Sequence, residues 1–164
     1  MKLNSGRRSG NFLSRGRWLG VLWILSVLML AGFGEVRAGG TSSTQTVQVK
    51  LDEWRMAMDQ AVLNSGKVTF KAVNQGTLDH EMVVIKTEVP ARTFTVKAAK
   101  VQEDAVGVVM GEIEGFPPGE MRTLTLDLPE GHYVLFCNNL EQGKSQGHYE
   151  QGMYVSFKVS PANR

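Results

Sequence analysis

The sequence predicts an all-β fold, a sandwich or a barrel, because apolar and polar residues alternate with a period of two in several short runs. Groups of Gly, Pro and Asn separate these runs and indicate tight turns. Short strands joined by such turns are typical of sandwiches and barrels. The chain has 164 residues, of which 42% are hydrophobic and 21% are charged, and this composition suits one domain with its own core.

Each alternating run marks an expected strand. The first covers residues 47–51, and the next, at 54–58, has the opposite parity, which predicts a bulge or bend near Asp52–Glu53. Four later runs alternate in the same way, at 68–72, 124–128, 133–137 and 153–159. Turn signals separate them, at 64–66, 74–76, 117–119 and 129–131.

The stretch 87–115 allows two interpretations. Val101, Ala105 and Val108 would form one stripe of a helix. Residues 106–113 could equally form a strand. We expect a long crossing connection here, which can include one short helix.

The N-terminus has the three parts of a secretory signal peptide. Residues 1–17 hold five basic residues and no acid, and an uncharged, mostly apolar run follows at 18–34. Val36 and Ala38 are the small residues that precede a cleavage point. We predict that 1–38 is a signal peptide and that the protein is exported, to the periplasm or another extracytoplasmic compartment. The alternative is a retained membrane anchor, since the apolar run is at the lower limit for spanning a bilayer.

Removing residues 1–38 reverses the sign of the net charge. Six of 18 basic and one of 16 acidic residues are lost, which leaves 12 and 15 and a formal charge of −3. The basic balance of the whole chain therefore belongs to the targeting segment, and we expect no binding of nucleic acid. In what remains, we expect a flexible lead-in at 39–45 and one domain at 46–164.

The small numbers of cysteine and histidine residues exclude several functions. One cysteine excludes an internal disulfide and any zinc site with two or four cysteines. Three histidines are too few for an enzyme with several copper centres, such as a copper oxidase or a nitrite reductase.

Four residues form a candidate metal site, because the strand pattern directs them inward: His80, Cys137, His148 and Met153. Cys137 ends the strand at 133–137, Met153 begins the last strand, and His148 lies in the loop between them. His80 opens a distant apolar run. Two imidazoles, one thiolate and a weakly bound thioether are the ligands of a type 1 copper site.

Each of these residues has a simpler interpretation when it is taken alone. Cys137 could be a small buried hydrophobe, Met153 could fill the core, and His148 could be a solvated loop residue. An unpaired cysteine in an exported protein needs an explanation, however, and metal ligation supplies one. We therefore expect the four residues to bind one copper ion. His132 lies on the opposite strand face from Cys137 and is expected to be a structural or surface residue.

Three segments of the sequence resemble the cupredoxins, the small blue copper proteins of the plastocyanin and azurin type: VTFKAVNQGTLDHEMVV, PEGHYVLFCN and GHYEQGMYVSFKV. The resemblance covers most of 46–160 and implies a Greek-key β-sandwich of about eight strands. It also implies three equatorial copper ligands, His80, Cys137 and His148, with Met153 as the axial ligand. The role implied by the family is one-electron transfer, and no enzymatic activity is expected.

The same resemblance makes His148 the ligand nearest the surface and the port for electrons. We expect redox partner proteins to dock near it, on an apolar rim of Gly147, Tyr149 and the Pro117–Pro118 pair. We also expect a monomer, whose contact with a membrane is limited to an uncleaved N-terminal segment.

Two features depart from the best-known members of the family. Ten residues separate Cys137 from His148, where plastocyanins have two. Glu81 follows His80, where plastocyanins and azurins carry an Asn that braces the cysteine loop. The hydrogen bonds to the thiolate, and with them the reduction potential, therefore stay open.

A second function uses the same four ligands, namely storage or delivery of copper without a role in a redox chain. The carrier is favoured because no Met-rich or His-rich tract occurs elsewhere in the sequence. A thiol enzyme using Cys137 and His148 is disfavoured, because an inward-facing cysteine at a strand end is poorly exposed.

Overall fold

The computed structural model describes residues 44–162 of the chain. The predicted signal peptide at 1–38 and most of the predicted lead-in at 39–45 lie outside the described residues. The last residue of that lead-in, Gln45, is the first residue of a strand. In the described part, no helix has the length and apolar character needed to cross a membrane.

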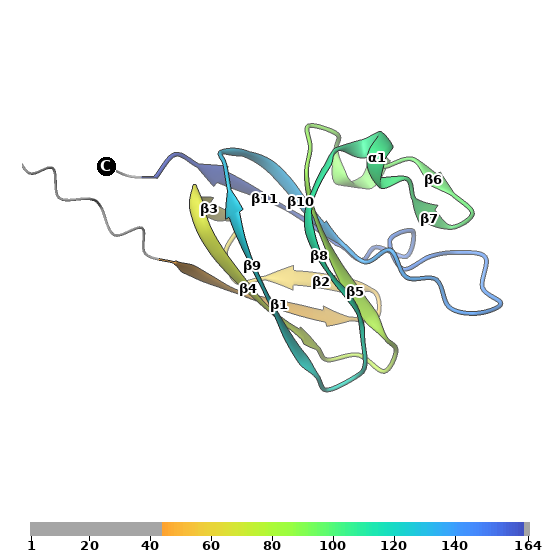
Figure 1. The fold of residues 1–164 in the computed structure, drawn as a ribbon. Coiled ribbons are helices and arrows are strands. Elements are labelled where there is room, and N and C mark those ends of the chain that lie inside the picture. Colours follow the sequence, from red (N-terminus) through yellow and green to blue (C-terminus); the bar gives the residue numbers. More distant parts are fainter. Residues whose placement is uncertain (1–43, 163–164) are drawn as a thin grey trace, which may run out of the picture. The chain divides into compact units, whose positions relative to one another are not determined.

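Two β-sheets pack face to face (Figure 1). The first has the order β2-β1-β4-β9, with strands at Arg55–Met58, Gln45–Asp52, Gly66–Asn74 and Met121–Leu128. The second has the order β3-β11-β10-β5-β8, with strands at Val62–Asn64, Tyr154–Ser160, Gly131–Phe136, His80–Lys86 and Val108–Phe116. The all-β sandwich predicted from the sequence is confirmed.

Alternating side chains fill the space between the two sheets. On β1, Val47, Val49 and Leu51 are fully buried, whereas the residues between them are exposed. Strand β4 repeats this pattern with Val68 and Phe70. Burying an apolar side chain of this size contributes about 1.5–3 kcal/mol. The alternation therefore determines which face of each strand points inward.

The predicted bulge or bend near Asp52–Glu53 is a complete reversal of the chain. Strand β2 runs antiparallel to β1 with Asp52 opposite Arg55, so that only Glu53 and Trp54 form the turn. A hairpin accounts for the change of parity, because Met56 on the returning strand pairs with Leu51 and enters the same core.

The stretch 87–115 contains both of the elements that the sequence allowed. A short helix, α1 (Glu103–Val106), precedes strand β8, so the expected short helix and most of the expected strand at 106–113 are both present. The helical stripe is wrong, because only Ala105 of its three residues lies in α1, whereas Val101 and Val108 lie in strands on either side of it. Before α1 lie a 3-10 turn at Ala91–Thr93 and a two-stranded ribbon of β6 (Val96–Lys97) and β7 (Lys100–Val101).

These small elements cover the outer face of β10. Val134 and Phe136, which alternate with the core-facing residues of that strand, are buried in a second apolar cluster with Phe94 and Val106. The rings of Phe94 and Phe136 meet edge to face with centroids 5.7 Å apart. Strand β10 is therefore buried on both faces, and Cys137, the residue that follows it, is held in closely packed surroundings.

The side chain of Asn74 connects three segments near the start of β5. Its Nδ2 donates to the carbonyls of Leu78 at 2.8 Å and Phe116 at 2.9 Å, and its Oδ1 accepts from the N–H of Gly76 at 3.0 Å. Asn74 is fully buried, so its loss would leave buried polar groups without partners. We expect Asn74→Ala to lower the free energy of unfolding by about 3 kcal/mol in urea denaturation.

The matched control for that substitution is Asn64→Ala, because the side chain of Asn64 is exposed at the end of β3. We expect a change of at most about 0.5 kcal/mol for this surface substitution. Equal losses in the two variants would contradict the role given to Asn74.

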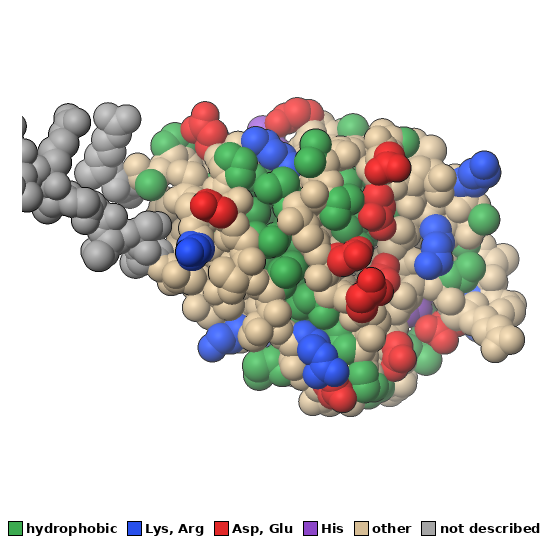
Figure 2. Space-filling model, in the orientation of Figure 1, with side chains coloured by type: hydrophobic (Ala, Val, Ile, Leu, Met, Phe, Trp, Pro, Cys, Tyr) green, Lys and Arg blue, Asp and Glu red, His purple; other side chains and the backbone are tan. Residues whose placement is uncertain are grey.

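Acidic side chains gather over the region of α1 and β8 on the face shown in Figure 2. Glu103 and Asp104 begin α1, and Glu112 and Glu114 lie on β8. The pKa of Glu112 is raised by partial desolvation and by the negative charges of Glu114 and Glu103. A surface of this kind attracts cationic groups and repels anionic ones.

Candidate metal centre

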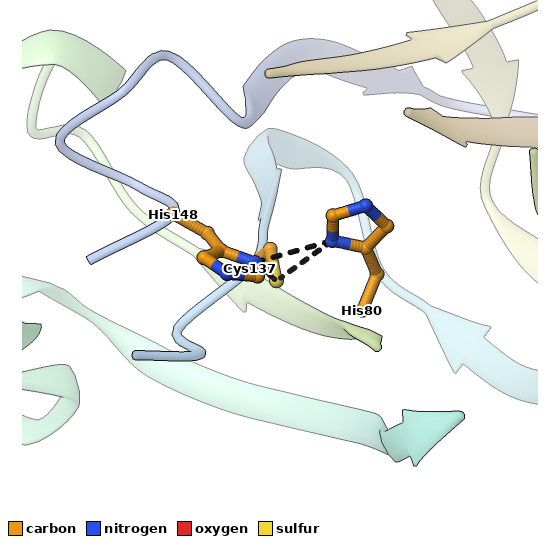
Figure 3. Close-up of side chains that lie close together, drawn as sticks. All are labelled: His80, Cys137 and His148. Atoms are coloured by element: carbon orange, nitrogen blue, oxygen red, sulfur yellow. Dashed lines mark hydrogen bonds between the residues drawn. The ribbon is translucent and has the colours of Figure 1, made fainter. Parts of the chain in front are cut away.

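Three side chains from separate parts of the chain converge in the interior (Figure 3). His80 is the first residue of β5, Cys137 follows β10, and His148 lies in the loop between β10 and β11. The Sγ of Cys137 is 3.3 Å from Nδ1 of His148 and 4.0 Å from Nδ1 of His80. The two Nδ1 atoms are 3.1 Å apart, and all three residues are fully buried.

The fourth predicted ligand, Met153, is joined to two of these residues through the backbone. The N–H of Cys137 donates to the carbonyl of Met153 at 3.0 Å, and the N–H of Met153 donates to the carbonyl of His148 at 3.1 Å. The Met153 side chain is fully buried in the same apolar cluster as Cys137. The structure therefore places all four predicted residues in one region, and their ligation of a metal stays a prediction.

The sandwich explains why residues so distant in sequence meet. Strands β5 and β10 are neighbours in one sheet, with Val83 opposite Phe136, so the start of β5 lies beside the end of β10. The loop after β10 is then attached to the residues before β5, because the Nδ2 of Asn139 donates to the carbonyl of Asp79 at 3.0 Å. The carbonyl of Asn139 accepts from the N–H of His148 at 2.8 Å.

The protonation of the imidazoles makes the cluster suitable for a metal. The outer nitrogen of each ring, Nε2, lies 3.2 Å from a carboxylate oxygen, that of Glu53 for His80 and that of Glu141 for His148. In the tautomer that donates its Nε2–H to the carboxylate, the neutral ring keeps a lone pair on Nδ1. Both Nδ1 atoms lie beside the sulfur of Cys137. Two imidazole nitrogens and a thiolate sulfur in one buried cluster fit one copper ion.

The two carboxylates were not among the predicted site residues. Glu53 belongs to the turn between β1 and β2, and Glu141 belongs to the loop after β10. Neither has a characteristic spacing from a histidine in the sequence. Only the hairpin and the long loop bring them to the site, so no sequence signal could have identified them.

Burial controls the protonation of the candidate ligands. It raises the pKa of the Cys137 thiol to about 12, against the effect of the backbone N–H groups that donate to the sulfur. Burial lowers the pKa of His80, and the charge of Glu53 offsets part of this effect. The pKa of His148 is lowered by burial and by the neighbouring His80. The imidazoles are therefore ready to bind a metal at neutral pH, whereas the thiol must first lose a proton.

Glu81, which departs from the family pattern, braces the cysteine loop. Its Oε1 accepts from the N–H of Asn138 at 2.7 Å, and its own N–H donates to the Sγ of Cys137 at 3.4 Å. Burial raises the pKa of Glu81, and the hydrogen bond from the N–H of Asn138 offsets only part of this effect. The Oδ1 of Asn138 in turn accepts from the N–H of Val101 at 2.6 Å. The brace thus connects the cysteine to the ribbon that covers β10.

We expect Glu81→Ala to weaken copper binding by about 10–100-fold, the usual cost of losing a hydrogen-bond partner that orients a ligand. Glu81→Gln keeps an acceptor for the N–H of Asn138 and should lose less affinity. Competition with a copper chelator measures both values. Glu114→Ala, on the exposed side of β8, serves as the control, and an unchanged affinity in Glu81→Ala would contradict the brace.

His148 is enclosed by other side chains. The ring of Trp54 lies edge-on to it, with centroids 5.0 Å apart and an interplanar angle of 63°. Tyr149, which was expected at an apolar rim, is also buried, and its hydroxyl donates to the carbonyl of Ala91 at 2.6 Å. The ring of Tyr149 is therefore not part of the surface, because the segment before α1 covers it. Partner docking near His148 stays a prediction.

His132 lies at the surface, as predicted. Its side chain is 58% exposed, and its Nδ1 is 2.8 Å from Oε2 of Glu88. His132 lies on β10 and Glu88 lies just after β5, and neither belongs to the cluster of His80, Cys137 and His148.

No known family profile matches this chain, and no curated protein matches it. Its fold is similar to those of solved structures. Reduced auracyanin from the photosynthetic bacterium Roseiflexus castenholzii is 20% identical, with a TM-score of 0.50, over 73% of this chain and 98% of the other. Rusticyanin from Thiobacillus ferrooxidans is 14% identical, with a TM-score of 0.52, over 71% of this chain and 77% of the other.

The two-sheet sandwich that carries the buried His–Cys–His cluster defines the fold class of the chain. The chain has the cupredoxin fold, as the sequence resemblance implied.

Proposed function

We propose that this protein is an extracytoplasmic type 1 copper protein that carries single electrons. The observation that supports this proposal is the convergence of Nδ1 of His80, Sγ of Cys137 and Nδ1 of His148 in a fully buried cluster, with Met153 beside it. One of the similar proteins, rusticyanin, is described as a copper protein. Export rests on the signal peptide predicted at 1–38.

The surroundings of the site favour rapid electron exchange. A bound copper would supply the one-electron change between Cu(I) and Cu(II). His80 and Cys137 lie at the ends of two paired strands, and His148 lies in the loop that follows Cys137. Hydrogen bonds join this loop to the residue before β5 and to Met153, the residue before β11. Such a frame resists displacement of the ligands when the charge of the ion changes, so little rearrangement opposes the transfer.

Storage or delivery of copper is the alternative. It uses the same ligands but requires that the ion leave the site readily. In the described part of the chain, all four predicted ligands are fully buried, and Trp54 and Glu141 enclose His148. Release would require this cover to open, and this requirement supports the carrier.

We propose no enzymatic role for the cluster. A thiol nucleophile reacts as the thiolate and must be reached by its substrate. Cys137 is fully buried, and its burial raises its pKa to about 12. Both properties oppose catalysis by a thiolate.

We propose that a redox partner docks near His148, against Trp54 and Glu141. A hollow of about 550 Å³ lies beside these two side chains and is also lined by Leu78 and Lys144. Trp54 is half-buried and its ring lies against the imidazole, so it offers an apolar route from the surface to His148. We expect the protein to dock as a monomer.

The proposed function is tested by titrating the metal-free full chain with Cu(II) and then recording voltammograms. A carrier should develop an intense visible band that saturates at one copper per chain, and a reversible one-electron wave with copper retained after repeated cycles. Binding without that band would favour storage or delivery. Transfer of the copper to an added chelator when the ion is reduced would favour the same function. No binding would contradict both functions.

A further inference from the structure

Both candidate histidine ligands are hydrogen-bonded to glutamates on the side that faces away from the cluster. Oε1 of Glu53 lies 3.2 Å from Nε2 of His80, and Oε1 of Glu141 lies 3.2 Å from Nε2 of His148. The two imidazoles are fully buried, so water does not compete for these nitrogens. Each ring therefore has one carboxylate on its outer nitrogen and its inner nitrogen in the cluster.

The carboxylate of Glu53 is held in place by backbone hydrogen bonds. Besides His80, its Oε1 accepts from the N–H groups of Thr77 at 2.8 Å and Leu78 at 2.9 Å. A Cβ on Gly76 would lie 2.8 Å from the carboxyl carbon of Glu53, so the absence of a side chain there leaves room for the acid. Both N–H groups donate to the carboxylate oxygen and so stabilise its negative charge.

Glu141 is held less firmly but approaches an equally buried ring. Its side chain is 35% exposed, compared with 22% for Glu53. The ring that it contacts, His148, is fixed on another edge by Trp54. The turn that supplies Glu53 therefore also supplies the residue that packs on the second imidazole.

We propose that Glu53 and Glu141 are a pair of positioning residues that hold both imidazoles in the Nε2–H form and favour the oxidised over the reduced copper ion. This inference rests on the proposed copper site and applies equally to a carrier and to a delivery protein. Cu(II) has one more positive charge than Cu(I), so two nearby anions stabilise the oxidised state more strongly. Imidazoles that donate to carboxylates are also more basic ligands, and this acts in the same direction.

The test compares Glu53→Gln, Glu141→Gln and the double variant with the wild-type full chain, all loaded with copper at the same neutral pH. Glutamine keeps an acceptor for Nε2–H but removes the charge. The reduction potential and the Cu(II) and Cu(I) affinities, measured by competition, are the readouts. We expect the ratio of Cu(II) to Cu(I) affinity to fall about tenfold per substitution, which raises a one-electron potential by about 59 mV. The effect should be larger for Glu53, which is the less exposed.

Glu88→Gln is a closely matched control, because Glu88 also binds a histidine, His132, at 2.8 Å but away from the cluster. It should leave the potential and both affinities unchanged. Unchanged values in both Glu53→Gln and Glu141→Gln would overturn the proposal. A shift of equal size in Glu88→Gln would also overturn it, because the effect would then come from overall charge alone.

A measurement without copper separates this inference from the proposed function. Long-range ¹H–¹⁵N spectra of the metal-free full chain report which imidazole nitrogen carries the proton. We expect Nε2–H at His80 and His148 in the wild type, and a growing Nδ1–H population in Glu53→Ala and Glu141→Ala at the ring that loses its carboxylate. Nδ1–H forms in the wild type would overturn the proposal. If the wild type lacked the visible band with copper, the proposed function would fail, and these spectra would still decide whether the two glutamates hold the imidazoles in the Nε2–H form.

Discussion

Replacing Cys137 by serine is expected to abolish the intense visible band of the copper-loaded protein and to weaken copper binding by more than about 100-fold. A 100-fold loss of affinity is the upper end of what the loss of an outer hydrogen-bond partner costs, and the loss of a ligand should exceed it. The band requires a thiolate bonded to copper, and Cys137 is the one cysteine in the chain. A serine hydroxyl has nearly the same size but does not ionise at neutral pH.

The measurement is a Cu(II) titration followed by absorbance, together with chelator competition for the affinity. Met82→Leu is a suitable control, because Met82 is fully buried in the same core cluster but is not a predicted ligand. Its volume is nearly conserved, so it should keep the band and the affinity. A band that survived in Cys137→Ser would show that the thiolate is not the source of the colour.

The affinity for Cu(II) is expected to rise about tenfold for each pH unit between pH 7 and pH 9. Burial raises the pKa of Cys137 to about 12, so the thiol of the metal-free protein is protonated throughout this range. Binding therefore releases one proton per copper. Raising the pH lowers the proton concentration and favours the bound state, which gives the positive sign of the dependence.

The imidazoles determine the behaviour at lower pH. Because burial lowers the pKa values of His80 and His148, both rings are neutral at pH 7 and add no protons to the release. Below their pKa values they become protonated, and the dependence of the affinity on pH should become steeper. Chelator competition at three pH values, corrected for the chelator, measures the slope, and Cys137→Ser should lose it above pH 7. A flat affinity between pH 7 and pH 9 would contradict a protonated thiol in the metal-free protein.

The alternation of apolar residues predicted most of the strands because one face of each strand packs in the core. Val47, Val49 and Leu51 on β1, and Val68 and Phe70 on β4, have the burial that period two indicates. Strand β3 escaped prediction because its three residues are too short for a period, and its pairing partner β11 is almost 100 positions away in sequence. The second apolar cluster was also missed, since alternation does not indicate that a distant segment covers the other face of β10.

The candidate ligands could be predicted from the sequence because each has a rare side chain at a position that strand parity or loop length makes informative. One cysteine and three histidines leave few combinations, and the strand pattern assigns His132 to the face away from Cys137. The sequence alone therefore determined the all-β class and the set of donors proposed to bind one copper.

Only the tertiary structure decided what surrounds those donors. Glu53, Trp54 and Glu141 reach the imidazoles because a hairpin reverses after β1 and a long loop folds back from β10. Their positions depend on contacts between segments far apart in the chain, and residue types and spacings do not encode such contacts locally. The potential and the exposure of a metal site depend on these outer neighbours, so both properties are decided by the fold.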